Sequence, residues 1–209
     1  MLDRPRFETL WSRRIGDDAG VVFDELETLY GEPHRAYHTA AHIEHCLRLC
    51  DLAADRMDEP DAVEMALWFH DAIYDIPARE NELRSAELFA ARAGGRGSER
   101  FRSNVHGLIM ATTHLDPPPA TLDEAFIVDI DLSSFGRPWD EFLDDSRAVR
   151  AELAHVPDAE FYPRQRKFLE SLAARPVFCF TEFFRERHEA RARENIERLC
   201  ARLEVVGRI

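Results

Sequence analysis

Apolar positions recur along most of this chain at the three- and four-residue spacing of amphipathic helices. Phe7, Leu10, Trp11 and Ile15 would share one helical face, and similar faces return as far as about residue 203. No alternating strand pattern of useful length interrupts them. The pattern predicts an all-α protein built as a single helical bundle.

The chain has 209 residues, which is enough for one domain with a substantial core. No segment between the expected helices has the length and composition of a domain linker. We therefore expect one domain over residues 1–209. Its core would span about 30–136, and C-terminal helices would follow over about 138–203.

One expected helix, from about Pro60 to Tyr74, is apolar nearly all round, which is typical of a buried helix. His70 and Asp71 nevertheless lie side by side in its last turns. Burying an unpaired carboxylate costs on the order of several kcal/mol. A divalent metal ion would compensate that charge, and a hydrogen-bonded His–Asp pair is the alternative.

A second expected helix begins near Thr39 or His38, either of which could be its N-cap, and runs to about Arg56. His38 and His42 are four residues apart, so both imidazoles would lie near one face if the helix begins this early. Cys46 and Cys50 fall one turn apart further along.

Two further segments place polar side chains among apolar ones. His106 and His114 are about two turns apart on one expected helix, and Asp129 and Asp131 interrupt an apolar helix over about 122–135. Aspartates two residues apart cannot face the same way, so one of them should point elsewhere or cap a backbone group. Taken together, the histidines and carboxylates suit Zn, Mn, Fe, Co or Mg, with water completing an open, catalytic type of site.

The composition indicates which kinds of partner the protein can bind. The net charge is −13, and the arginines are interleaved with acids, whereas a surface for long nucleic acid needs a basic stripe. No run of eighteen apolar residues predicts a membrane span, and the first residues lack the apolar core of a signal peptide. The four cysteines include no Cys-x-x-Cys pair, which is typical of reduced thiols. We expect a cytoplasmic protein, and homodimer formation is left open.

The ordered set His42, His70-Asp71 and Asp131 resembles the signature of the HD superfamily of metal-dependent phosphohydrolases. Tyr37-His38-x-x-x-His42 is similar to an element of cyclic-nucleotide phosphodiesterases, and Asp131-Leu132-Ser133 to the segment carrying their last metal ligand. The segments 68–75 and 129–133 also resemble a bacterial branch of predicted HD phosphohydrolases. The resemblance covers about residues 30–199.

This resemblance implies an HD-type helical domain that holds one or two divalent ions, of Mn, Zn, Fe, Co, Ni or Mg. The implied metal ligands are His42, His70, Asp71 and Asp131. Asp71 would be the residue to bridge to a second ion, because a carboxylate offers two oxygens. His38 would protonate the leaving oxygen.

Further roles follow for residues around these ligands. Asp75 could orient the attacking water, and Glu82 and His114 could serve a second metal or support the first. Arg35 could bind a phosphate by a forked contact, or could be an ordinary solvated arginine.

The leading functional hypothesis is a metal-dependent hydrolase of a nucleotide or another small phosphoester. It would act on neither long nucleic acid nor a membrane. One alternative is a di-iron oxygenase of the HD type, which needs more histidine ligands than His106 and His114 can easily supply. The other alternative is a metal-binding or regulatory module without turnover.

Overall fold

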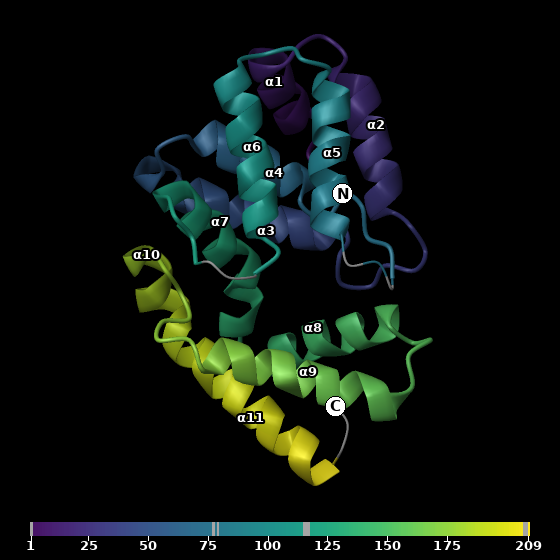
Figure 1. Cartoon of the computed structure of the whole chain (residues 1–209), viewed down its shortest axis with the longest axis vertical. Coiled ribbons are helices and arrows are strands. Elements are labelled where there is room, and N and C mark those ends of the chain that lie inside the picture. The colour runs from purple at the N-terminus through teal and green to yellow at the C-terminus, as the bar shows by residue number, and fades with distance from the viewer. Residues whose placement is uncertain (1, 77, 79, 115–117, 207–208) are drawn as a thin grey trace. The chain divides into compact units, whose positions relative to one another are not determined.

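The computed structural model describes residues 2–76, 78, 80–114, 118–206 and 209 (Figure 1). The regular elements of these residues are all helical, and they include no strand. The all-α prediction is therefore confirmed. No helix within the described ranges is long and apolar enough to cross a membrane.

The contacts divide the chain into two compact units, residues 1–128 and 129–209. The division falls inside the continuous helix α7 (Leu122–Asp131), which begins in the first unit and ends in the second. The single domain expected from the sequence stays a prediction.

The other elements of the first unit follow one another through short connections. They are α1 (Arg4–Arg14), α2 (Ala19–Tyr30), α3 (Ala40–Ala53), the 3-10 turn η1 (Ala54–Arg56), α4 (Pro60–Phe69), α5 (Asn81–Ala93) and α6 (Glu99–Ala111). Their core is rich in aromatic rings. Phe7 of α1 lies with its ring centroid 5.3 Å from that of Trp68 and 5.7 Å from that of Trp11.

Helix α4 is the buried helix that the sequence predicts. All of its apolar residues after the first turn are buried, including Trp68 and Phe69. Fully burying one large apolar side chain contributes about 1.5–3 kcal/mol. This helix therefore forms the centre of the first unit, and its burial fixes the position at which His70 and Asp71 begin.

The expected end of this helix at Tyr74 is wrong, because α4 ends at Phe69 and His70 is its C-cap. Beyond it the Ala72 amide donates to the Phe69 carbonyl at 2.9 Å. The guanidinium of Arg35 donates to the main-chain oxygens of Asp71 and Ala72 at 2.7 and 2.8 Å. Because these carbonyl oxygens accept hydrogen bonds from the Arg35 guanidinium, they are not available to continue the helix. The helix therefore ends although the apolar pattern continues beyond it.

Helix α3 begins as expected, with Thr39 at the N-cap accepting a hydrogen bond from the Ala41 amide at 3.3 Å. His38 therefore precedes the helix, and the shared helical face of His38 and His42 does not form. Likewise, α6 ends at Ala111, and His114 lies beyond it with a φ of 56°. The expected helix carrying both His106 and His114 is wrong, because the chain leaves α6 three residues before His114.

The second unit is also built from helices. It contains η2 (Leu132–Gly136), α8 (Trp139–Glu152), α9 (Asp158–Ala173), α10 (Glu182–Phe184), the π-helical turn η3 (Arg185–Glu189) and α11 (Ala190–Val206). The helix expected over 181–203 is thus interrupted by a π turn.

Asp129 explains why two aspartates can interrupt an apolar helix. Its buried carboxylate accepts hydrogen bonds from the Phe180 amide at 2.8 Å and from the amide and hydroxyl of Thr181 at 2.7 and 2.6 Å. Burial raises the pKa of Asp129 to about 6, although these three donors act in the opposite direction. The expectation that one of the two aspartates caps backbone groups is confirmed, which leaves Asp131 for another role.

Candidate metal centre

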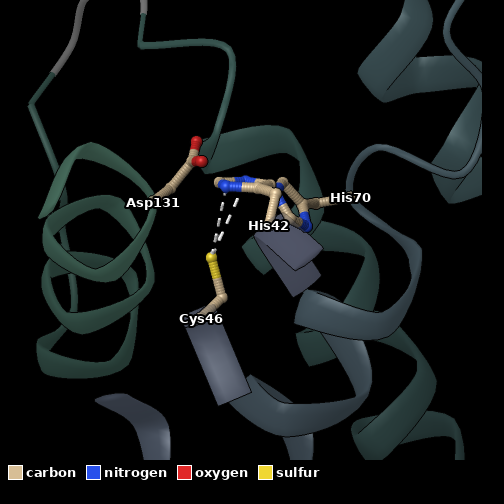
Figure 2. Close-up of side chains that lie close together, drawn as sticks. All are labelled: His42, Cys46, His70 and Asp131. Atoms are coloured by element: carbon tan, nitrogen blue, oxygen red, sulfur yellow. Dashed lines mark hydrogen bonds between the residues drawn. The ribbon is translucent and has the colours of Figure 1, made fainter. Parts of the chain in front are cut away.

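Helix α3 places two side chains that can bind metal on one face. His42 and Cys46 are one helical turn apart, and their residues are 6% and 0% exposed. Cys46 Sγ lies 3.7 Å from His42 Nε2 (Figure 2). Because both belong to the same rigid helix, their spacing does not depend on how any loop is arranged.

The end of α4 brings His70 to the same place. Its Nδ1 lies 3.0 Å from the Leu67 carbonyl oxygen, which can only accept a hydrogen bond. As a metal ligand, His70 would therefore keep its proton on Nδ1 and present the lone pair of Nε2. That nitrogen lies 3.3 Å from His42 Nε2, so two imidazole nitrogens point at one spot.

Asp71 completes a triangle of possible ligand atoms with the two histidines. Its Oδ2 lies 3.1 Å from His70 Nε2 and 3.4 Å from His42 Nε2. The same oxygen is buried, with these two imidazole nitrogens beside it. Ligand atoms about 2.1 Å from a shared ion stand roughly 3.0–3.4 Å apart, so these three atoms fit a divalent cation.

The electrostatics of Asp71 agree with this reading. Burial alone would raise its pKa, but positive charge on the neighbouring imidazoles of His70, His38 and His42, with a hydrogen bond from His70, outweighs burial and lowers the pKa of Asp71 well below its ordinary value. The carboxylate is therefore ionised in its pocket of histidines. A buried negative oxygen beside two imidazole nitrogens is a natural ligand for a divalent cation, which would supply the positive charge that protonated imidazoles otherwise provide.

A wider group of four residues also converges. His42, Cys46, His70 and Asp131 each offer one ligand atom, and these atoms all lie within 4.8 Å of one another (Figure 2). Asp131 is the last residue of α7 and is half-buried. This His–Cys–His–Asp group could hold a metal ion.

Cys46 is the member that the sequence prediction missed. The pattern His42-x-x-x-Cys46 on a helix could have identified it, because residues four apart share a face. Of the predicted ligands, Asp71 lies against the two histidines but outside the four-residue group.

The short segment that carries Asp71 is held from two sides. From α5, Ser85 Oγ accepts from the Ile73 amide at 3.0 Å, and the Asn81 side chain exchanges two hydrogen bonds of 3.1 Å with the main chain of Asp75. From the other side, Arg35 binds Asp71 as described. The position of Asp71 is therefore determined by contacts outside its own segment.

Arg35 is placed differently from both interpretations of the sequence. Its side chain is fully buried. It donates to the main-chain oxygens of His38 at 3.0 Å and of Asp71 and Ala72, and it pairs with Glu32 at 3.0 Å. Arg35 is thus not a solvated arginine, and its placement favours a structural role over the forked phosphate contact.

His38 lies beside the group without belonging to it. Its half-buried ring stacks on Tyr74 with centroids 4.0 Å apart and lies 6.1 Å from the His42 ring. The stacking fixes the plane of the imidazole close to the candidate ligands. Its role as a general acid stays a prediction.

The remaining predicted residues lie outside the candidate metal group. Asp75 is exposed and forms an ion pair with Arg84. Glu82, in the first turn of α5, and His114 are half-buried, and neither belongs to the four-residue group found in the described part of the chain. Supporting roles for these residues stay predictions.

Comparisons with protein-family models, with curated proteins and with solved structures found no match to this chain. The resemblance to the HD superfamily therefore rests on the residues quoted from the sequence. The candidate metal centre rests on geometry, which is independent of that resemblance.

Proposed function

We propose that this protein is a metal-dependent phosphohydrolase of the HD type, acting on a nucleotide or another small phosphoester. One observation carries the proposal. His42 Nε2, His70 Nε2 and Asp71 Oδ2 stand 3.1–3.4 Å apart, and the carboxylate oxygen is buried against the two imidazoles. A divalent cation at the centre of this triangle would compensate the buried carboxylate and leave both imidazoles neutral as its ligands.

In this proposal His42, His70, Asp71 and Asp131 hold the ion. When bound, a divalent ion polarises a phosphoryl oxygen and lowers the pKa of a coordinated water toward neutrality. His38 protonates the leaving oxygen, and its stacking on Tyr74 keeps the imidazole in a fixed plane for that transfer.

The substrate class follows from charge. The net charge of −13 repels a long polyanion, which must lie along much of the protein surface. A small phosphate compound contacts only the site, so the charge of the site itself decides whether it binds. Arg35 donates its hydrogen bonds to main-chain oxygens, so it holds the segments that carry His38 and Asp71 in place. A metal ion is then the natural positive charge for the phosphate.

The test is a hydrolysis screen of the purified protein with Mn²⁺ or Co²⁺, using nucleoside phosphates and cyclic nucleotides. His70→Ala should reduce turnover by about a hundredfold or more, because it removes one of the converging nitrogens. His106→Ala is the matched control on α6, outside the four-residue group, and should leave turnover nearly unchanged.

Two outcomes would contradict the proposal. One is turnover that survives His70→Ala unchanged, since the hydrolysis would then come from elsewhere. The other is a native protein that binds the metal tightly but hydrolyses none of these esters. That second outcome favours the regulatory alternative, in which the site binds metal without turnover.

A further inference from the structure

The distance between Cys46 Sγ and His42 Nε2 suits two ligands of one ion. Around a tetrahedral cation, two nitrogens lie about 3.3 Å apart, and a nitrogen and a sulfur lie about 3.6 Å apart. The corresponding distances here are 3.3 Å from His42 Nε2 to His70 Nε2 and 3.7 Å from His42 Nε2 to Cys46 Sγ. All three residues belong to the first unit.

The surroundings of Cys46 support the same conclusion. It is completely buried, and its sulfur faces the imidazole of His42 (Figure 2). Cys50, one turn further along α3, is also buried but does not belong to the four-residue group. Helix α3 therefore carries two buried thiols, of which Cys46 belongs to the candidate metal centre and Cys50 does not.

We propose that Cys46 Sγ is a ligand of the metal ion held by His42 and His70, which makes the site selective for zinc-like ions over Mg²⁺ and Mn²⁺. Thiolate is a soft ligand that binds Zn²⁺ and Co²⁺ well, whereas Mg²⁺ and Mn²⁺ prefer carboxylates and water. The thiol loses its proton to solvent as the ion binds. This inference rests on the metal site of the proposed function, but not on phosphoester hydrolysis.

Cobalt is the direct probe, because thiolate bound to Co²⁺ gives a near-ultraviolet charge-transfer absorption that nitrogen and oxygen ligands do not give. The 209-residue chain, freed of metal by a chelator, is titrated with Co²⁺. We expect the band to reach saturation in the native protein and in Cys50→Ser. It should disappear in Cys46→Ser while His42 and His70 still bind cobalt.

Selectivity gives a second readout. Cys46→Ser should weaken Zn²⁺ binding by about tenfold or more and change Mn²⁺ binding by less than about threefold. X-ray absorption of the zinc-loaded native protein needs no variant, so it decides the matter even if Cys46→Ser fails to fold. It should detect one sulfur at about 2.3 Å from zinc.

The proposal is overturned if the charge-transfer band persists in Cys46→Ser, or if zinc in the native protein has only nitrogen and oxygen neighbours. Failure to bind Co²⁺ or Zn²⁺ at all also overturns it. Hydrolysis is measured separately, so the two proposals fail differently. Sulfur ligation can be absent from an active hydrolase, and a cobalt–thiolate band can be present in a protein that hydrolyses nothing.

Discussion

Replacing Arg35 tests whether the metal-binding segments are held by this buried guanidinium. In Arg35→Met the aliphatic stem is kept, but the donors to the main-chain oxygens of His38, Asp71 and Ala72 are lost. Hydrogen bonds from a charged donor are worth about 1.5–3 kcal/mol each. Apart from the ion pair that Arg35 also forms with Glu32, these three bonds set a limit of roughly 4.5–9 kcal/mol.

The measured loss should be smaller than this limit, because water can reach some of the released oxygens. We expect Arg35→Met to lower the free energy of unfolding of the first unit by about 3–5 kcal/mol. That is a large part of the roughly 5–15 kcal/mol available to an ordinary domain. Arg35→Lys should recover less than half of the loss, because one ammonium cannot span three planar acceptors.

Urea unfolding followed by tryptophan fluorescence measures the effect, since Trp68 is buried on α4 next to this segment. Arg84→Met is the matched control. It breaks an exposed ion pair with Asp75 and should cost less than about 1 kcal/mol. Equal losses in Arg35→Met and Arg84→Met, or full recovery in Arg35→Lys, would refute the reasoning.

Three further changes probe other parts of the fold. Gly97→Ala should destabilise by more than about 3 kcal/mol in thermal unfolding, because a Cβ would stand 2.3 Å from the Arg14 carbonyl oxygen, at a φ of +67°. Asp123→Ala should cost about 1–2 kcal/mol in urea unfolding, because Asp123 accepts hydrogen bonds of 2.8 and 2.9 Å from two amides just before α4. Glu189→Gln should flatten the loss of stability in acid: although burial acts to raise its pKa, hydrogen bonds from two backbone amides and one arginine lower the pKa of Glu189 below its ordinary 4.5. The stabilisation from Glu189 is thus present above pH 4.5 and fades as the pH falls through its lower folded-state pKa.

Each of these has a contrary result. Gly95→Ala keeps a positive φ but meets open space, so a loss as large as that of Gly97→Ala would remove the steric argument. Asp123→Asn retains an acceptor, and it should be milder than Asp123→Ala. For Glu189, urea unfolding between pH 7 and pH 3 with the same slope in both proteins would exclude a contribution from this carboxylate.

Much of the fold could be predicted from the sequence because helices are local. The spacing of apolar residues located the helices. Thr39 and Ser98 indicated two N-caps, and in the structure both side chains accept hydrogen bonds from backbone amides. The apolar residues on nearly every face of α4 indicated its burial. Such signals depend on residues within a few positions of each other, so they can be read without knowing what packs against them.

The sequence alone also determined that histidine and carboxylate groups had to be reconciled with an apolar interior, and it named His42, His70, Asp71 and Asp131 as the residues concerned. Only the tertiary structure decided that α4 stops at Phe69. It alone also decided that Arg35 is buried and that Cys46 lies next to the histidines. It also decided that Asp129 and Asp131 have different partners. These outcomes depend on contacts between residues far apart in the chain, such as the carboxylate of Asp129 with Thr181. A helical pattern fixes which side chains share a face, but only packing determines which other element that face meets.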